Sequence, residues 1–243
     1  MKKGWSYLSW FTLLLFWFIL FYTVDHRLIL PSPLDVLLAL GSLAGEGSSF
    51  AIMGLSLIRL LVAVSVSAIL GIVLGFFAGV HHHISQLMHP YLTLLRTIPI
   101  ISIVVILMIL LGYQVTPYVL TFLMVFPLIY QATEDGIKQI DKKLIDVYRL
   151  ETHNLNMAFR YLYLPLIKPF IILALIQSFG LGLKVLVMAE YLSQTKHSIG
   201  QALYLAKTNL AYDEVFAWTL ILILLSVFFE ALINRYKKHM IEG

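Results

Sequence analysis

The amino-acid sequence predicts an all-α membrane protein with about six transmembrane helices. Of its 243 residues, 60% are hydrophobic and only 12% are charged, whereas about 25% of the residues of a soluble domain are charged. The mean hydropathy is +0.89. Because so few charges cannot cover a globule with polar surface, we interpret residues 1–243 as a single transmembrane domain in a lipid bilayer. The sequence has no cysteine, which excludes disulfides, iron–sulfur clusters and thiolate zinc sites.

Six apolar stretches are long enough to cross a bilayer, which takes roughly 20 residues. The first follows Lys2 and Lys3, but its apolar run is longer than that of a signal peptide and no small-residue cleavage site follows it. We therefore expect this segment to be retained as a helix. The predicted spans cover about residues 5–24, 52–80, 86–112, 115–132, 166–192 and 213–234.

The distribution of Lys and Arg predicts that both termini lie in the cytoplasm, because cytoplasmic loops carry an excess of these residues. With the N-terminus inside, three of them fall in outer loops, namely Arg27, Lys196 and Lys207. Eleven fall on the cytoplasmic side: Lys2, Lys3, Lys138, Lys142, Lys143, Arg149, Arg160, Lys168, Arg235, Lys237 and Lys238.

The connections between the spans differ in length and character. In the outer loop at 25–50, the turn Leu30-Pro31-Ser32-Pro33 predicts a rigid elbow, since each proline restricts its own φ and the preceding residue. A short helix on the outer membrane surface should follow, and the outer segment at 193–212 should form a partly helical cap. The largest cytoplasmic region is 133–165. Its polar stretch at 146–165 predicts an amphipathic helix that can dock onto a soluble partner.

Glycine and proline mark two of the spans. Gly71, Gly75 and Gly79 recur every four residues, so they share one face of the second span and predict close packing against another helix. Pro90 and Pro99 interrupt the third span by removing hydrogen bonds of the helix. A helix broken in this way is either kinked or lines a cavity.

Charged residues within the spans are candidates for function, because such charges are costly and usually face the bundle interior or water. Arg96 lies three residues before Pro99. It either pairs with another residue of the bundle or lies in a path through the membrane. Glu190 lies near the outer end of the fifth span, and Lys184 lies two turns deeper on a different helical face. Arg59 is expected to pair or to snorkel. We take Arg96, Pro99, Lys184 and Glu190 as candidate path residues.

Catalytic and metal sites are not indicated. The run His81-His82-His83 has no neighbouring acid or cysteine to complete a metal site, and Asp213-Glu214 is interpreted as a solvated helix start. No GxSxG or HExxH motif occurs, and no phosphate loop ends in Gly-Lys-Ser/Thr. We therefore predict no enzymatic activity, no bound cofactor and no ATP hydrolysis by the P-loop route. The net charge of +4 is explained by the Lys and Arg residues that mark the cytoplasmic side of a membrane protein, so it does not indicate binding of nucleic acid.

Several short motifs resemble those of the permease subunits of binding-protein-dependent ABC importers of the nitrate/sulfonate/taurine type. The resemblance covers nearly the whole chain after the first span, and it implies the type I ABC importer permease fold. The matching segments are LPSP at 30–33, SLIR at 56–59 before the three glycines, RTIP at 96–99 with Gly112 thirteen residues beyond the proline, and AE at 189–190 followed by IG at 199–200.

The resemblance also implies a site that couples to an ATPase. The family's coupling motif is EAA, then glycine, then I-x-L-P, and Pro165 sets its register here. The hydrophobic frame is kept, while the small residues and the glycine are replaced. The motif positions are occupied, in order, by Asp146, Val147, Tyr148, Thr152, Leu162, Leu164 and Pro165.

By this resemblance, two permease subunits form a central path, most simply as a homodimer, and an extracytoplasmic substrate-binding protein delivers the solute. Two ABC ATP-binding subunits dock at about 146–160 and hydrolyse ATP. The family carries small solutes such as nitrate, sulfonates, bicarbonate and vitamin precursors, and Lys184 would favour an anion. The alternatives are an ion-coupled secondary transporter, which usually has buried carboxylates at mid-membrane, and a non-transporting membrane scaffold.

Overall fold

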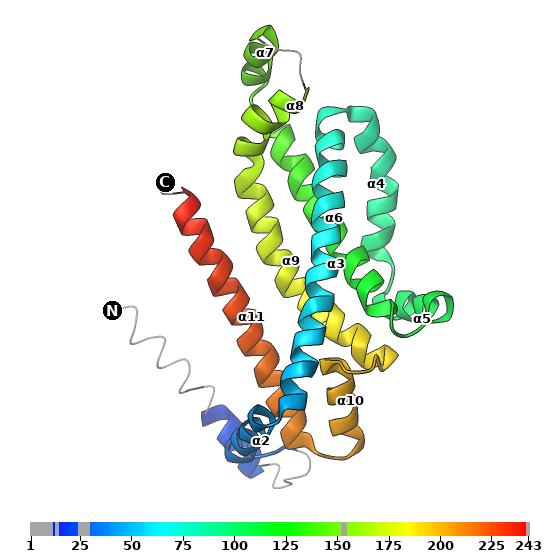
Figure 1. The fold of residues 1–243 in the computed structure, drawn as a ribbon, viewed down its shortest axis with the longest axis vertical. Coiled ribbons are helices and arrows are strands. Elements are labelled where there is room, and N and C mark those ends of the chain that lie inside the picture. The colour runs from blue at the N-terminus through cyan, green and yellow to red at the C-terminus, as the bar shows by residue number, and fades with distance from the viewer. Residues whose placement is uncertain (1–11, 13–14, 24–29, 152–154, 242–243) are drawn as a thin grey trace.

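The computed structural model describes residues 12, 15–23, 30–151 and 155–241. Helices make up most of this part of the chain, which contains no β-strand (Figure 1). The all-α prediction is therefore confirmed. The helices are α2 (Pro33–Gly45), α3 (Gly47–Val80), α4 (His82–Thr97), α5 (Ile100–Leu111), α6 (Thr116–Lys138), α7 (Lys142–Glu151), α8 (Leu155–Ala158), the π-helical turn η1 (Phe159–Tyr163), α9 (Leu164–Ser193), α10 (Ile199–Thr208) and α11 (Tyr212–Ile241).

Within the described residues, four helical stretches are long and apolar enough to cross a membrane, at 47–80, 116–138, 159–193 and 212–232. They correspond to the second, fourth, fifth and sixth predicted spans. Of the first predicted span, only residues 12 and 15–23 are described, and these are helical. Whether residues 5–24 cross the membrane stays a prediction.

The third predicted span is sharply bent. The axes of α4 and α5 differ by 99° across a short break. Ile98 has extended backbone geometry (φ −65°, ψ 130°), which is the conformation that a following proline favours, and Pro99 caps the start of α5. Pro90, in contrast, lies inside α4 without ending it. The interruption predicted at two prolines therefore occurs at Pro99 alone.

The glycine face of α3 packs directly on α6, as the sequence predicted. A Cβ atom on Gly75 would lie 2.6 Å from the carbonyl oxygen of Tyr130, and one on Gly79 would lie 2.7 Å from Cβ of Ile137. The two backbones can approach this closely only because side chains are missing on one of them. Helix α9 completes the centre of the bundle, and its residues Leu183 and Leu186 share an apolar core with α3 and α6.

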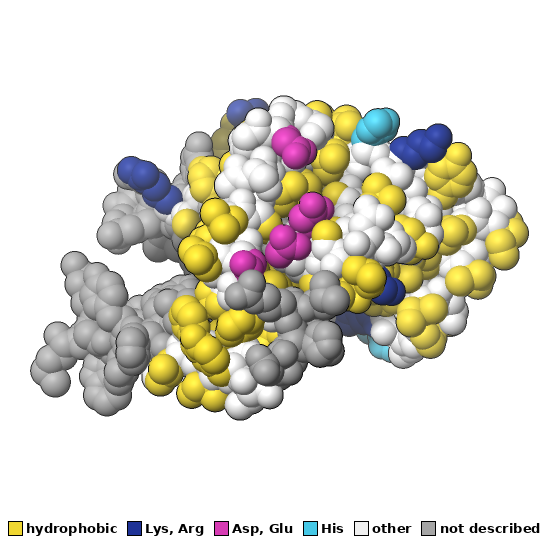
Figure 2. Space-filling view, turned by 90° about the horizontal axis from the view of Figure 1, so that it is seen from below, with side chains coloured by type: hydrophobic (Ala, Val, Ile, Leu, Met, Phe, Trp, Pro, Cys, Tyr) yellow, Lys and Arg dark blue, Asp and Glu magenta, His cyan; other side chains and the backbone are white. Residues whose placement is uncertain are grey.

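One end of the bundle carries α2, α10 and the start of α11 (Figure 1), and we call it the outer end in keeping with the predicted orientation. The predicted elbow is confirmed by a capping box. The Ser32 hydroxyl accepts a hydrogen bond from Asp35 N at 3.1 Å, and Ser32 N donates to Asp35 Oδ2 at 3.2 Å. Acidic side chains gather on this end (Figure 2), and Asp213 and Glu214 lie in the first turn of α11 as predicted.

The opposite end, which we call the inner end, carries α7 and α8 beyond the start of α9 (Figure 1). The polar stretch predicted as one amphipathic helix is divided among α7, α8, η1 and the first turn of α9. In the second part of this stretch, aromatic residues pack onto α3: the ring of Phe76 lies 4.8 Å from that of Phe159 and 5.4 Å from that of Tyr163. This anchors η1 to the bundle and leaves α7 projecting.

Candidate functional site

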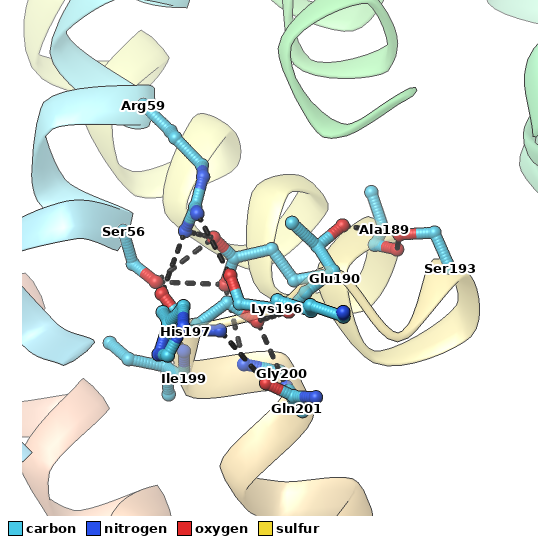
Figure 3. A network of polar contacts seen from close by, with 12 residues as sticks. Ser56, Arg59, Ala189, Glu190, Ser193, Lys196, His197, Ile199, Gly200 and Gln201 are labelled. Atoms are coloured by element: carbon cyan, nitrogen blue, oxygen red, sulfur yellow. Dashed lines mark hydrogen bonds and ion pairs between the residues drawn. The ribbon is translucent and has the colours of Figure 1, made fainter. Parts of the chain in front are cut away.

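Glu190 on α9 is the centre of a buried polar network at the outer end of the bundle (Figure 3). Its side chain is 0% exposed. Its Oε1 atom pairs with NH1 of Arg59 on α3 at 3.1 Å and accepts a hydrogen bond from Ser56 Oγ at 2.9 Å. Its Oε2 atom accepts from the backbone N of Gly200 at 3.3 Å. A buried carboxylate requires such partners, so the charge of Glu190 is balanced within the chain.

Arg59 extends this network to the link between α9 and α10. Its NH1 atom donates to the carbonyl oxygen of His197 and its NH2 atom to that of Lys196, both at 3.1 Å. In this link, Gln194 and His197 have φ values of 51° and 53°, which are unfavourable for residues other than glycine. Arg59 thus holds a strained turn in place. Of the two roles expected for Arg59, the structure supports pairing over snorkelling.

Gly200 brings the start of α10 against the end of α9. A Cβ atom there would lie 2.3 Å from Tyr191 N, so only glycine fits. Next to it, Ile199 N donates to Ser56 Oγ at 3.0 Å. Three motifs that are far apart in the sequence, at 56–59, 189–190 and 199–200, therefore meet in one network. This network is a structural cross-link, and the predicted place of Glu190 in a path stays a prediction.

Arg96 and Pro99 lie at the junction of α4 and α5. Arg96 donates to the carbonyl oxygen of Pro127 at 3.2 Å and also to Oε1 of Gln131, both on α6. The side chain lines a polar cavity of about 200 Å³ between α4 and α6, which also includes Glu134. Arg96 therefore has structural partners, while a contact with a translocated solute stays a prediction.

Lys184 lies in a groove between α9 and α11. Two cavities of about 280 and 530 Å³ adjoin here and share Leu183, Lys184 and Ser226. The smaller cavity also contains Gln177 and Glu230, whereas the larger one is mostly apolar. Lys184 is exposed in this groove. Its ammonium group is therefore available to an anion or to the Glu230 carboxylate.

The predicted coupling residues fall into two groups at the inner end. Thr152 lies outside the described residues. The rest lie partly on α7 and partly where η1 leads into α9. The first group is Asp146, Val147 and Tyr148 on α7, and the second is Leu162 in η1 with Leu164 and Pro165 at the start of α9.

Two features were missed at the level of sequence. One is the aromatic contact of Phe76 with η1. The three aromatic residues shortly before Pro165 were the signal in the sequence that could have indicated it. The other is the position of Glu230 in the groove with Lys184. An acidic residue inside an apolar stretch was its signal, but helix pairing cannot be read from local sequence.

Comparisons with known proteins agree with this architecture. A family model described as "Binding-protein-dependent transport system inner membrane component" matches residues 71–242. The putative aliphatic sulfonates transport permease protein SsuC of Bacillus subtilis is 27% identical over 194 residues, which cover 79% of this chain and 70% of that protein. A probable ABC transporter permease protein of Brucella melitensis biotype 1 is 23% identical over 227 residues, covering 93% and 91%.

A similar fold occurs in a solved structure. One chain of the MetNI methionine ABC transporter in inward-facing conformations superposes with a TM-score of 0.63 at 16% sequence identity, covering 78% of this chain and 96% of that chain. At this identity the likeness concerns the fold alone. The family model, however, spans well over half of the chain. The protein therefore belongs to the family of inner membrane components of binding-protein-dependent transport systems, and it is a multi-pass permease subunit of an ABC importer.

Proposed function

We propose that this permease is driven by separate ATP-hydrolysing subunits that dock onto α7. The observation that carries the proposal is a stripe of apolar side chains on this projecting helix. Leu144 is 50% exposed, Val147 is 60% exposed and Leu150 is 87% exposed. Their spacing of three residues places them on neighbouring positions of one helical side. Because α7 lies beyond the ends of the long helices (Figure 1), a protein partner is the better cover for this stripe than lipid.

The charge distribution supports the side of the membrane on which docking occurs. Lys138 ends α6 and Lys142 and Lys143 begin α7, all at the inner end, and an excess of Lys and Arg favours the cytoplasm. We therefore place α7 and both chain termini in the cytoplasm. ATP is hydrolysed there by the partner subunits, and this chain contributes no nucleotide site.

The transport path is formed by two permease subunits, most simply two copies of this chain. A substrate-binding protein delivers the solute to the outer end, where acidic side chains gather (Figure 2). The relative SsuC is named as an aliphatic sulfonates permease, and Lys184 in the α9–α11 groove supplies a positive charge. A small anion such as a sulfonate is thus the solute that this chain is proposed to carry, with Lys184 as a contact in the path.

The docking proposal is tested by removing the apolar stripe from α7. Leu150→Ser with Val147→Ser should abolish co-purification of an ABC ATPase with the tagged chain from its own cells, together with ATP-dependent uptake. Lys142→Ser is the matched control, because it lies on the same helix away from the stripe and should retain the ATPase. Retention of the ATPase by the Leu150/Val147 variant would contradict docking at α7. Absence of any ATPase from the wild-type complex would favour an ion-coupled transporter instead.

A further inference from the structure

Two opposite charges share one cavity inside the membrane-spanning part of this chain. Lys184 on α9 and Glu230 on α11 both line the cavity of about 280 Å³, together with Gln177 and Ser226. Within the part of the chain that the structure describes, neither charged group forms a hydrogen bond or an ion pair. Lys184 lies well inside its apolar stretch, at 159–193, where an unpaired charge is costly and marks a functional position. Glu230 lies two positions before the end of the stretch at 212–232.

Lys184 lies too far from the end of its helix for its charge to reach the outer membrane surface. The residue lies nine positions before the end of α9 at Ser193, which is roughly 14 Å at 1.5 Å per residue. An extended lysine side chain is much shorter than this distance, so it cannot snorkel to the outer surface. The exposed ammonium group therefore lies within the groove.

The helix directions bring the two side chains toward each other. Helix α9 runs from the inner to the outer end and α11 runs back (Figure 1). Side chains of a helix lean toward its N-terminus, so Lys184 leans inward while Glu230 leans outward. Glu230 lies one helical turn farther inward than Ser226. Lys184 leans toward this level. The charges therefore converge on the same cavity from opposite directions.

The smaller of the two cavities lies beside Glu230 and the larger one lies farther out. Phe179 of α9 stacks on Phe229 of α11 with ring centroids 5.3 Å apart, which holds the helices together beside Glu230. Farther out, the cavity of about 530 Å³ separates Val187 and Met188 from Leu222.

We propose that Glu230 is a further functional residue of transport, the counter-charge of Lys184, and that the two close an ion pair across the groove in one state of the transport cycle. The pair is open in this structure and closes when α9 and α11 approach. This inference rests on the proposed transport function. Its physical basis is that an ion pair in a low-dielectric groove stabilises whichever conformation forms it.

A double-variant comparison tests the pair in the assembled transporter. Lys184→Met and Glu230→Gln should each lower ATP-driven uptake about tenfold, the factor that corresponds to 1.4 kcal/mol. The double variant should lose no more uptake than the weaker single variant, since the effects of coupled residues are non-additive. Lys168→Met on the same helix, outside the groove, should have no effect. Losses that multiply to about a hundredfold in the double variant would overturn the proposal.

Cysteine cross-linking provides a second readout that does not depend on uptake. The chain contains no native cysteine, so Lys184→Cys with Glu230→Cys places the only two thiols of this subunit in the groove. Their oxidative cross-linking should differ between the nucleotide-free and ATP-trapped complexes, and equal yields would contradict a closing groove. A wild-type complex whose uptake does not depend on ATP would refute the proposed function, whereas ATP-driven uptake with multiplying losses in the double variant would refute the pair alone.

Discussion

The buried network around Glu190 makes a quantitative prediction for Arg59→Met. Methionine keeps the apolar stem of the side chain but removes the guanidinium, which donates to Glu190, Lys196 and His197. The Glu190 carboxylate would then keep only Ser56 and the backbone of Gly200 as donors. It would remain a buried charge without a counter-ion.

The expected magnitude follows from the burial of the pair. The two side chains are 9% and 0% exposed, so solvent screens their interaction little. Removing one partner of a buried ion pair costs about 3–5 kcal/mol. For a chain of this size each kcal/mol lowers the melting temperature by about 2–4 °C, which gives a decrease of roughly 6–20 °C. The effect should appear first at the link between α9 and α10, because Arg59 holds its carbonyl groups.

The assay is thermal unfolding of the purified chain in one detergent, followed by size-exclusion chromatography of the heated samples. Glu190→Gln should lower the melting temperature less than Arg59→Met, since the amide still accepts from Ser56 and Arg59 keeps its two carbonyl acceptors. The double variant should lose less than the sum of the single losses, because no buried carboxylate is left unpaired. If Arg59→Met melts within about 2 °C of wild type, or if the two losses add, the network does not balance the Glu190 charge.

Three further predictions concern packing and transport. Gly75→Leu should prevent the contact between α3 and α6 and lower the yield of folded protein, since a Cβ atom there lies 2.6 Å from the Tyr130 carbonyl oxygen. The control Gly54→Leu places its Cβ atom in open space and should leave the yield unchanged. Equal yields of the two variants would contradict the close packing. Arg96→Met should lower the stability by about 1 kcal/mol, the net value of a partly exposed polar contact, as measured by detergent melting, and a loss of uptake without a change in melting would instead place Arg96 in the path. Lys184→Met should reduce uptake of an anionic solute while the ATPase still co-purifies, and unchanged uptake kinetics would remove Lys184 from the path.

Local features of the fold could be predicted because their causes lie within a few residues. The capping box of α2 needs only Ser32 and Asp35. The glycine face of α3 is visible as a four-residue spacing, and the break before Pro99 follows from the missing N–H and the restricted preceding residue. The angle of 99° between α4 and α5 was not predictable, because a proline ends a helix without setting the direction of the next one.

Features that depend on distant partners could not be predicted. Arg59 and Glu190 are 131 positions apart, and nothing in either local sequence specifies the other. The turn η1 departs from α-helical geometry where Phe159 and Tyr163 pack onto Phe76, a contact between segments that are more than eighty residues apart. In both cases tertiary packing selects the local structure.

Lys184 and Glu190 show why charge in a span is a poor guide to function until its partners are known. They lie on the same helix six residues apart, and from sequence alone both are costly charges near the outer half of a span. Glu190 is fully buried and receives hydrogen bonds from Ser56, Arg59 and Gly200, so its cost is offset within the resting fold. Lys184 has no such partner among the described residues. A solute or an approaching helix can stabilise a charge only when that charge has no partner already. We therefore expect replacement of Glu190 to change folding and replacement of Lys184 to change transport.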